Sequence, residues 1–243
     1  MKLLEGKKIS KRFGGLLALN DVDFYVDAGE IVGLIGPNGA GKTTLFNVIA
    51  GTFPPTSGEL TFEGIRINGL KPHQICKLGI ARTFQTPKPF PNMTVYENVL
   101  VPFTFGRRAG KSPSIRQEIE KLLGDFGLAE KSMTTASKLP LFEQRLLELV
   151  KAVSLNPKLL LLDEVMAGLN PAETEKMLKT IQGLRDSGVT VFMIEHNMRA
   201  LMKIAERIMV LHHGSKICEG PPEEIVKNRK VIEAYLGEAY VSR

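Results

Sequence analysis

The chain has 243 residues, of which 43% are hydrophobic and 24% are charged, a composition typical of globular proteins. Its apolar runs fall well short of the roughly 20 residues that a membrane-spanning helix needs. Its two cysteines, Cys76 and Cys218, lack the number and spacing of a disulfide framework or a zinc site. The net charge of +6 suits an anionic partner (a nucleotide, a nucleic acid or an acidic membrane face) without choosing among them. The densest basic cluster, Arg107, Arg108 and Lys111, favours a solvated loop over lipid contact.

Predicted strands dominate the first part of the chain. Between Val22 and Val26, apolar residues alternate with polar ones, which predicts a strand exposed on one face. The segment Ile31–Ile35 is continuously apolar, which predicts a strand buried on both faces. Buried strands that alternate with helices predict a parallel α/β core. This pattern recurs later in the chain, with strands at 159–162 and 189–194 and helices at 171–184 and 198–208.

The middle of the chain, residues 92–153, contains no comparable buried strand. Helical patterns at 115–126 and Leu141–Val153 are separated by Pro, Gly, Ser and Thr. We therefore predict a helical subdomain inserted into a single α/β domain. Its mostly parallel core and an N-terminal antiparallel β subdomain are formed by residues 1–91 and 154–243.

A glycine-rich segment directly follows the strand Ile31–Ile35 and precedes a predicted helix at 45–50. This strand–loop–helix setting is that of a P-loop, in which backbone N–H groups and the helix N-terminus surround phosphates. Lys42 is placed to reach the β and γ phosphates of a nucleotide, and the Thr43 hydroxyl to ligate Mg²⁺. The predicted nucleotide-binding residues are Gly36, Pro37, Asn38, Gly39, Ala40, Gly41, Lys42, Thr43 and Thr44.

Two carboxylates end the predicted strand at 159–162. Asp163 is placed to bind magnesium, directly or through water, and Glu164 to polarise the attacking water as a general base. A P-loop alone leaves kinases, GTPases, recombinases and transporters open. The carboxylate pair at the end of a buried strand reduces the number of these protein classes that fit the sequence.

With these two motifs, the sequence resembles the ABC ATPase family, a group of P-loop NTPases, from about residue 3 to residue 238. Phe84-Gln85-Thr86 is similar to the family's Q-loop, and Ile194-Glu195-His196 to its H-loop. The resemblance implies ATP and Mg²⁺ as ligands. Gln85 is expected to bind the metal or the attacking water, His196 to bond the γ-phosphate during catalysis, and Phe13 to stack on adenine. The alternative for Phe13 is packing beneath the antiparallel strands.

Within the family, the sequence is most similar to the LivG-like branch, which energises branched-chain amino-acid uptake. The strings that carry this resemblance are 82–85, 167–171, 194–198 and 234–238. Branches that serve urea, aromatic acids or lipopolysaccharide export carry similar strings, so these substrates stay open as alternatives.

The resemblance also implies partners and a location. The partners are a second ABC ATPase subunit, two transmembrane permeases and an extracytoplasmic solute-binding protein, and the location is cytoplasmic, on the inner face of the plasma membrane. Two alternatives are a soluble ABC ATPase that acts on nucleic acid or ribosomes, and a regulatory subunit that barely hydrolyses ATP. Because the chain has one cassette and no aromatic–basic stacking segment, we expect no nucleic-acid partner.

The largest departure from the family lies in the signature loop, which grips the γ-phosphate held by the opposing subunit. Pro140 offers neither a hydroxyl nor an N–H there, Phe142 adds bulk and Glu143 adds negative charge. Losing two charge-assisted hydrogen bonds costs roughly 3–6 kcal/mol, which favours a heterodimer with an ordinary cassette. The alternative is that Pro140 simply begins a helix and other groups compensate. The degenerate signature residues are Leu139, Pro140, Leu141, Phe142, Glu143 and Gln144.

Overall fold

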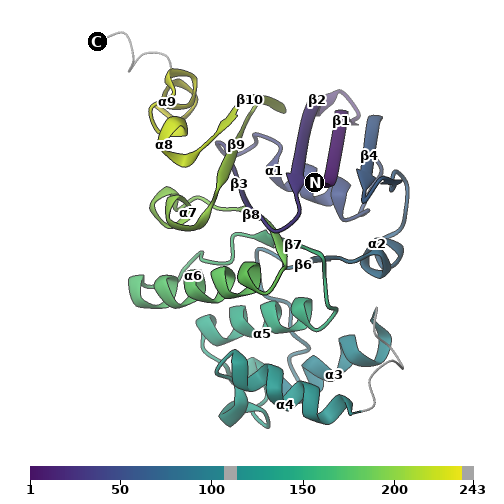
Figure 1. Ribbon diagram of the computed structural model, residues 1–243, viewed down its shortest axis with the longest axis vertical. Coiled ribbons are helices and arrows are strands. Elements are labelled where there is room, and N and C mark those ends of the chain that lie inside the picture. Colours follow the sequence, from purple (N-terminus) through teal and green to yellow (C-terminus); the bar gives the residue numbers. More distant parts are fainter. Residues whose placement is uncertain (107–113, 237–243) are drawn as a thin grey trace.

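The computed structural model describes residues 1–106 and 114–236, which fold into two β-sheets and a set of helices (Figure 1). The basic cluster Arg107, Arg108 and Lys111 lies outside the described residues, as do the last two residues of the string at 234–238. Among the residues that are described, none of the helices has both the length and the apolar character to cross a bilayer.

The first sheet is antiparallel and has the strand order β2-β1-β4-β5. Val22, Phe24 and Val26 of β2 are buried, and the residues between them are exposed. The predicted alternation is therefore confirmed, and the sheet forms the expected N-terminal β subdomain. Its strands are β1 (Lys2–Phe13), β2 (Leu16–Asp27), β4 (Ser57–Phe62) and β5 (Ile65–Arg66).

The second sheet has six strands in the order β10-β9-β3-β8-β7-β6. Every neighbouring pair is parallel except β9 and β10, which confirms a mostly parallel core. Its strands are β3 (Ile31–Ile35), β6 (Ile80–Arg82), β7 (Leu159–Asp163), β8 (Thr190–Ile194), β9 (Arg207–His212) and β10 (Ser215–Gly220).

This sheet lies between two hydrophobic cores, which explains why its strands read as continuous apolar runs. Val32 and Leu34 of β3 face a core shared with helix α1 (Lys42–Ile49) and the antiparallel sheet. Ile31 and Ile35 face the opposite core, which is shared with the helices on the other side. Each residue of β3, β7 and β8 is buried as a result.

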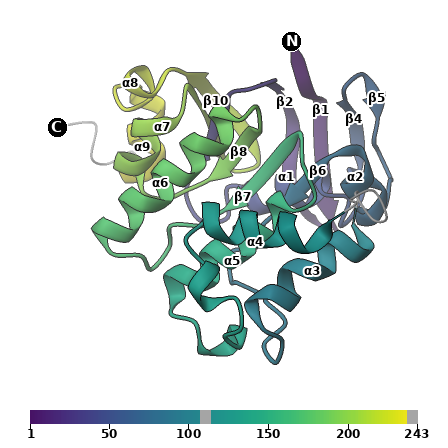
Figure 2. The ribbon, with the colours of Figure 1, turned by 60° about the horizontal axis from the view of Figure 1, so that its bottom comes forward.

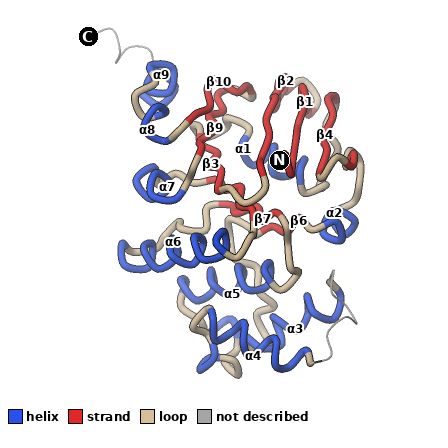
Figure 3. Tube along the Cα trace, in the orientation of Figure 1, coloured by secondary structure: helices blue, strands red, loops and turns tan. Residues whose placement is uncertain are grey.

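The described part of residues 92–153, the predicted helical subdomain, contains helices and no strand (Figure 3). Its first helix is fixed by a capping box, in which the Thr94 hydroxyl accepts the N–H of Glu97 and the Glu97 carboxylate accepts the N–H of Thr94. The last helix begins at Leu141, directly after Pro140, and has the bounds predicted from the sequence. The subdomain contains α3 (Val95–Phe105), α4 (Ile115–Asp125), two short 3-10 turns and α5 (Leu141–Val153).

The helix predicted at 198–208 is too long. Helix α7 (Met198–Ile204) ends because Ala205 adopts an extended backbone, and Arg207 already belongs to β9. The chain turns there because Ile208 pairs with Gly33 in the parallel sheet, so tertiary strand pairing overrides the local helical pattern.

The C-terminal helices pack beside β10, far from the helical subdomain (Figures 1 and 2). Val231 of the last helix is buried in the same core as Ile208 and Val210 of β9. The C-terminal segment is therefore part of the folded domain. The remaining helices are α2 (Pro72–Leu78), α6 (Pro171–Asp186), α8 (Pro222–Ile225) and α9 (Arg229–Leu236).

Candidate active site

A cavity of about 610 Å³ opens where the P-loop meets the ends of β7 and β8. It brings Gln85, Glu164 and His196, three residues predicted from separate motifs, to the glycine-rich loop. The cavity is lined by Leu16, Leu17, Ala18, Asn38, Gly39, Ala40, Gly41, Lys42, Thr43, Thr44, Gln85, Glu164, His196, His213 and Gly214.

The loop turns from β3 into α1 through two glycines in the left-handed region, Gly39 (φ 79°) and Gly41 (φ 102°). Gly41 is also sterically required, because a Cβ there would lie 2.6 Å from the carbonyl oxygen of Ala18. The first backbone N–H groups of α1 have no acceptor within the helix, so they are available to phosphate oxygens. The geometry is that of an anion site.

Lys42 is 6% exposed, and its ammonium donates to the carbonyl oxygens of Gly36 (2.6 Å) and Pro37 (3.0 Å). Burial lowers its pKa, and the nearby carboxylates of Glu164 and Asp163 oppose that effect. The lysine is thus held directly over the loop, with its charge partly offset by the two acids of the second motif.

Asp163 ends β7 and is 2% exposed. One of its oxygens, Oδ2, accepts from Arg82 Nη2 at 2.8 Å, and Arg82 Nη1 also donates to Asn47 at 2.6 Å. Its other oxygen, Oδ1, is buried and accepts no hydrogen bond from the described residues. A buried carboxylate oxygen that accepts no hydrogen bond from the described residues fits the hard oxygen ligands that Mg²⁺ requires.

Glu164 is the centre of the site. Its Oε2 accepts from Gln85 Nε2 at 2.9 Å, and its Oε1 lies 2.8 Å from His196 Nε2. Its backbone has φ 50°, a conformation that side-chain-bearing residues seldom adopt and that often accompanies functional sites. The carboxylate is thus held from two sides and still lines the cavity.

Two charged residues that the sequence analysis did not predict support this centre. Glu195 is 3% exposed, and its Oε1 accepts the N–H of Met166 at 3.0 Å, which fixes the turn after Glu164. Burial raises the pKa of Glu195 to about 7, the bond from Met166 opposes this, and the charge of Glu164 adds to it. From α5, Arg145 donates to the carbonyl oxygens of Gln85 and Ala167 and so joins the helical subdomain to both loops.

A family model described as "ABC transporter" matches residues 19–167, more than half of the chain. The chain belongs to the ABC transporter family. A second model, described as "Branched-chain amino acid ATP-binding cassette transporter", matches residues 215–241. The chain is therefore an ATP-binding cassette with ATPase activity coupled to transport.

Similar proteins support the family assignment over nearly the full chain. Two curated relatives are each 41% identical over 251 residues, covering 98% of both chains: the high-affinity branched-chain amino acid transport ATP-binding proteins BraF of Pseudomonas aeruginosa and LivG of Escherichia coli K12. The lipopolysaccharide export ATP-binding protein LptB of Acidithiobacillus ferridurans is 34% identical over 98% of both chains. Among solved structures, the ADP conformation of an ABC transporter cassette has a TM-score of 0.89 and 32% identity, covering 98% of this chain and 100% of that one.

The segment predicted to be the signature loop, residues 139–144, leads into a helix. Pro140 is the N-cap of α5, so the N–H groups of residues 141–143 have no intrahelical acceptor, and the first helical bond is Gln144 N–H to Pro140 O at 3.0 Å. The Phe142 side chain packs against the hydrophobic core, so much of its bulk points inward. The charge of Glu143 is offset by an ion pair with Lys131.

Phe13 does not line the nucleotide cavity. Its ring meets the edge of the Phe53 ring with centroids 5.1 Å apart, and the Lys11 ammonium lies over both rings. The side chain nevertheless remains 44% exposed, at the end of β1 beside the cavity residues Leu16 and Leu17. In this structure, the Phe13 ring packs against Phe53 and is not buried beneath the strands. Adenine stacking stays a prediction.

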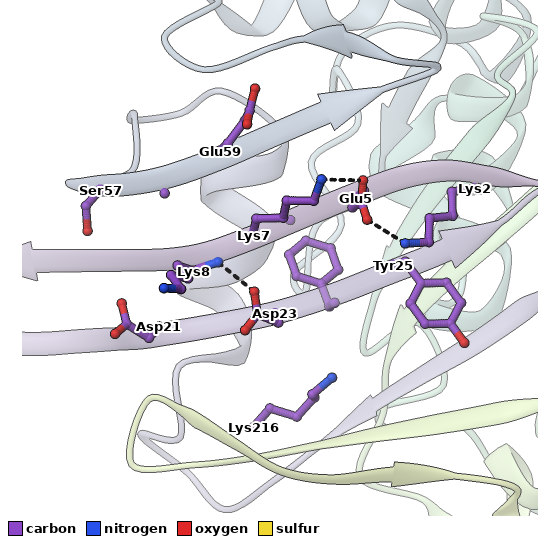
Figure 4. Close-up of a pocket in the computed structure, with 13 residues that line it drawn as sticks. Lys2, Glu5, Lys7, Lys8, Asp21, Asp23, Tyr25, Ser57, Glu59 and Lys216 are labelled. Atoms are coloured by element: carbon purple, nitrogen blue, oxygen red, sulfur yellow. Dashed lines mark hydrogen bonds and ion pairs between the residues drawn. The ribbon is translucent and has the colours of Figure 1, made fainter.

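The cassette has a larger cavity, about 770 Å³, on the outer face of the antiparallel sheet (Figure 4). Its charged groups bond to one another: Lys2 and Lys7 both contact Glu5, and the N–H of Lys8 donates to Asp23. The site predicted from the motifs therefore lies in the smaller cavity, where the chemistry of the phosphate loop is found.

Proposed function

We propose that this chain hydrolyses ATP with Glu164 as the general base, and that the hydrolysis powers an importer of branched-chain or closely related amino acids. The observation that carries the catalytic part is the convergence of Gln85 and His196 on the Glu164 carboxylate beside the P-loop. No other carboxylate lines this cavity among the described residues.

Lys42, Glu164 and His196 have separate roles in the proposed hydrolysis. ATP displaces the Lys42 ammonium from the carbonyls of Gly36 and Pro37, because phosphate oxygens are stronger, charged acceptors. Glu164 Oε2 exchanges its bond from Gln85 for one from the attacking water and takes the proton of that water. His196 Nε2, now beside Glu164 Oε1, donates to the γ-phosphate as negative charge moves onto the leaving group.

The proposed hydrolysis also uses Mg²⁺ as a cofactor. Thr43, Gln85 and Asp163 are the residues that would hold it. When bound, the metal neutralises charge on the β and γ phosphates. Asp163 Oδ1 is the protein oxygen best prepared for this role, because it is buried and accepts no hydrogen bond from the described residues.

The assignment to amino-acid import rests on two similarities. The relatives with 41% identity are branched-chain amino acid transport proteins, whereas the lipopolysaccharide export protein is 34% identical. The C-terminal residues 215–241 match a model specific to branched-chain amino acid cassettes. The identities favour this substrate class over lipopolysaccharide, and urea and aromatic acids stay open as alternatives.

A permease partner is supported by a groove of about 310 Å³ next to the Q-loop. Phe84, which precedes Gln85, is 46% exposed there, and Phe105 at the end of α3 is 80% exposed. Exposed aromatic side chains beside a loop that reaches the active site fit a short helix of a membrane subunit. The groove is lined by Arg82, Phe84, Val101, Pro102, Phe105, Gly106, Glu148, Lys151, Ala152 and Leu155.

The remaining partners follow from the same proposal. A second cassette completes each ATP site, and the altered signature at Pro140 and Phe142 favours a heterodimer. Two permeases and an extracytoplasmic solute-binding protein complete the importer, and this chain lies on the cytoplasmic face of the plasma membrane. Neither nucleic acid nor a ribosome is expected as a partner.

The test is uptake by cells that lack the native copy of this chain. Restoring the wild-type chain should restore uptake of radiolabelled leucine, isoleucine or valine, and Glu164→Gln, produced at the same level, should not. Urea, phenylalanine and lipopolysaccharide transport are measured in parallel. Restoration of one of those instead would reassign the substrate, and copurification with RNA rather than membrane proteins would reject the transporter proposal.

A further inference from the structure

The C-terminal helix α9 contacts the phosphate loop directly. The backbone N–H of Gly36, the first residue of the loop, donates to the Tyr235 hydroxyl at 2.8 Å. The two residues are 199 positions apart in the chain. Neither the motifs of the loop nor the hydrolysis scheme gives this tyrosine a role.

The Gly36 residue has little freedom to move. A Cβ at this position would lie 2.1 Å from the carbonyl oxygen of Leu211, so the backbone of β9 packs directly against it. Its own carbonyl accepts the Lys42 ammonium at 2.6 Å. The two peptide groups that flank the Gly36 Cα are thus bonded to different parts of the molecule, one to the C-terminal helix and the other to the phosphate-binding lysine.

Helix α9 is anchored well enough to hold its side of this contact. Val231, one turn before Tyr235, is 6% exposed and belongs to the core that includes Ile225 of α8 and Val210 of β9. Tyr235 itself is half-buried, and burial raises the pKa of its phenol, so the hydroxyl stays protonated at neutral pH. A neutral hydroxyl accepts the Gly36 N–H and retains its own proton for a water.

We propose that Tyr235 is a positioning residue of the nucleotide site, through which helix α9 holds the start of the phosphate loop in its nucleotide-binding shape. When ATP draws the Lys42 ammonium away from the Gly36 carbonyl, the Tyr235 hydroxyl remains as a polar contact that fixes this residue. By linkage, nucleotide binding must in turn stabilise the docking of α9, because a coupling between two sites acts equally in both directions.

The experiment uses the full-length chain and MgADP, which binds without turnover. Tyr235→Phe removes a single oxygen, and Tyr25→Phe is the matched control, because Tyr25 is similarly exposed but lies on the outer face of the antiparallel sheet. By calorimetry well below the melting temperature, we expect the Kd of Tyr235→Phe to rise about three- to tenfold, the loss of one hydrogen bond. The control should stay within twofold of the wild type.

Hydrogen exchange supplies the second readout, which a purely structural role would not change. In the wild-type chain, MgADP should slow exchange of the amides of residues 229–235, and this protection should shrink in Tyr235→Phe. The rise in Tm produced by MgADP should also be smaller in that variant. A Tyr235→Phe chain that melts lower but binds MgADP with an unchanged Kd would overturn the proposal. Hydrogen exchange in α9 of the wild-type chain that is the same with and without MgADP would also overturn it.

Discussion

The Glu164 carboxylate lies 2.8 Å from the His196 imidazole through one oxygen and 2.9 Å from the Gln85 amide through the other. Both oxygens of the proposed base therefore have a side-chain partner in this structure. The carboxylate also lines the cavity, so the two contacts orient it toward the phosphate loop.

Replacing Glu164 by Gln should abolish turnover and leave ATP binding intact. The amide keeps an oxygen that accepts from Gln85 Nε2 but has no basicity, so hydrolysis by the assembled complex should fall by about 10²- to 10⁴-fold. ATP affinity, measured by calorimetry, should change by less than about threefold, since the phosphate loop is untouched. Near wild-type hydrolysis in the complex would remove Glu164 from the role of base.

Replacing Lys42 by Ala should act on binding instead. The loop loses its ammonium, and the interaction of a charged donor with phosphate contributes about 1.5–3 kcal/mol, so the Kd for ATP should rise by roughly 10- to 100-fold. The control is Lys179→Ala on the exposed face of α6, which should bind ATP normally. A folded Lys42→Ala chain with unchanged affinity would contradict the proposed contact.

Stability should depend on pH through Glu195. Its pKa is raised from 4.5 to about 7, so the folded state binds this proton more tightly than the unfolded state does. Protonation of Glu195 therefore adds up to about 3 kcal/mol of stability at low pH relative to high pH, and this contribution is lost as pH rises from 4.5 to about 7.

Glu195→Gln tests this sign, because its amide oxygen can still accept the N–H of Met166. Urea unfolding should show a gain in stability over the wild type that is larger at pH 8 than at pH 5.5. An equal difference between the two chains at both pH values would show that Glu195 does not titrate in this range.

The altered signature predicts asymmetric activity. This chain alone, with Mg²⁺ and ATP, should neither dimerise stably nor hydrolyse ATP at the rate of the heterodimer. Pro140→Ser should stabilise α5 by about 1 kcal/mol, because serine is a good N-cap, and should raise hydrolysis at the reciprocal site. Robust turnover by a wild-type homodimer would refute the asymmetry.

Phe142→Gly is less suitable than Pro140→Ser for testing hydrolysis at the reciprocal site. The side chain is partly buried against the core, so removing it should destabilise the fold by less than the roughly 3–5 kcal/mol lost when a fully buried Phe is truncated. We expect a lowered melting temperature and no gain in hydrolysis. An increase in turnover would show that the Phe142 side chain obstructs the opposing phosphate despite its packing.

Base selectivity should be weak. Recognition of adenine by the Phe13 ring would use a π face that every purine possesses. GTP should then compete with ATP within about a hundredfold, or roughly 2.8 kcal/mol. Greater selectivity would point to hydrogen bonds from another cavity residue, and loss of ATP binding in Phe13→Ala would show that the ring leaves Phe53 to stack on the base.

The sequence sufficed wherever the local pattern and the tertiary environment agree. The run Ile31–Ile35 is buried on both faces, and the turn into α1 requires the glycines that follow it. The sequence therefore predicts the strand, the loop and the helix together. Leu141–Val153 combines a helix-starting proline with a clear apolar stripe, and its predicted bounds were correct.

The sequence was insufficient where long-range contacts decide. Nothing local indicates that Arg82 pairs with Asp163, 81 positions away, or that Tyr235 reaches Gly36. His213 and Gly214 line the cavity because the β9–β10 turn is bonded to the P-loop, with Gly214 N–H donating to Ala40 O at 3.0 Å. The ending of helix α7 at Ile204 likewise depends on β9 pairing with β3.

The pairing of Arg82 with Asp163 also has a consequence for metal binding. A bare divalent cation meets a carboxylate whose charge is already neutralised by a guanidinium, and the neighbouring ammonium of Lys42 repels it further. A metal that arrives already coordinated to a triphosphate carries a net negative charge and is attracted by the same two cations. We therefore expect the site to bind free magnesium weakly, and metal and nucleotide to enter as one complex.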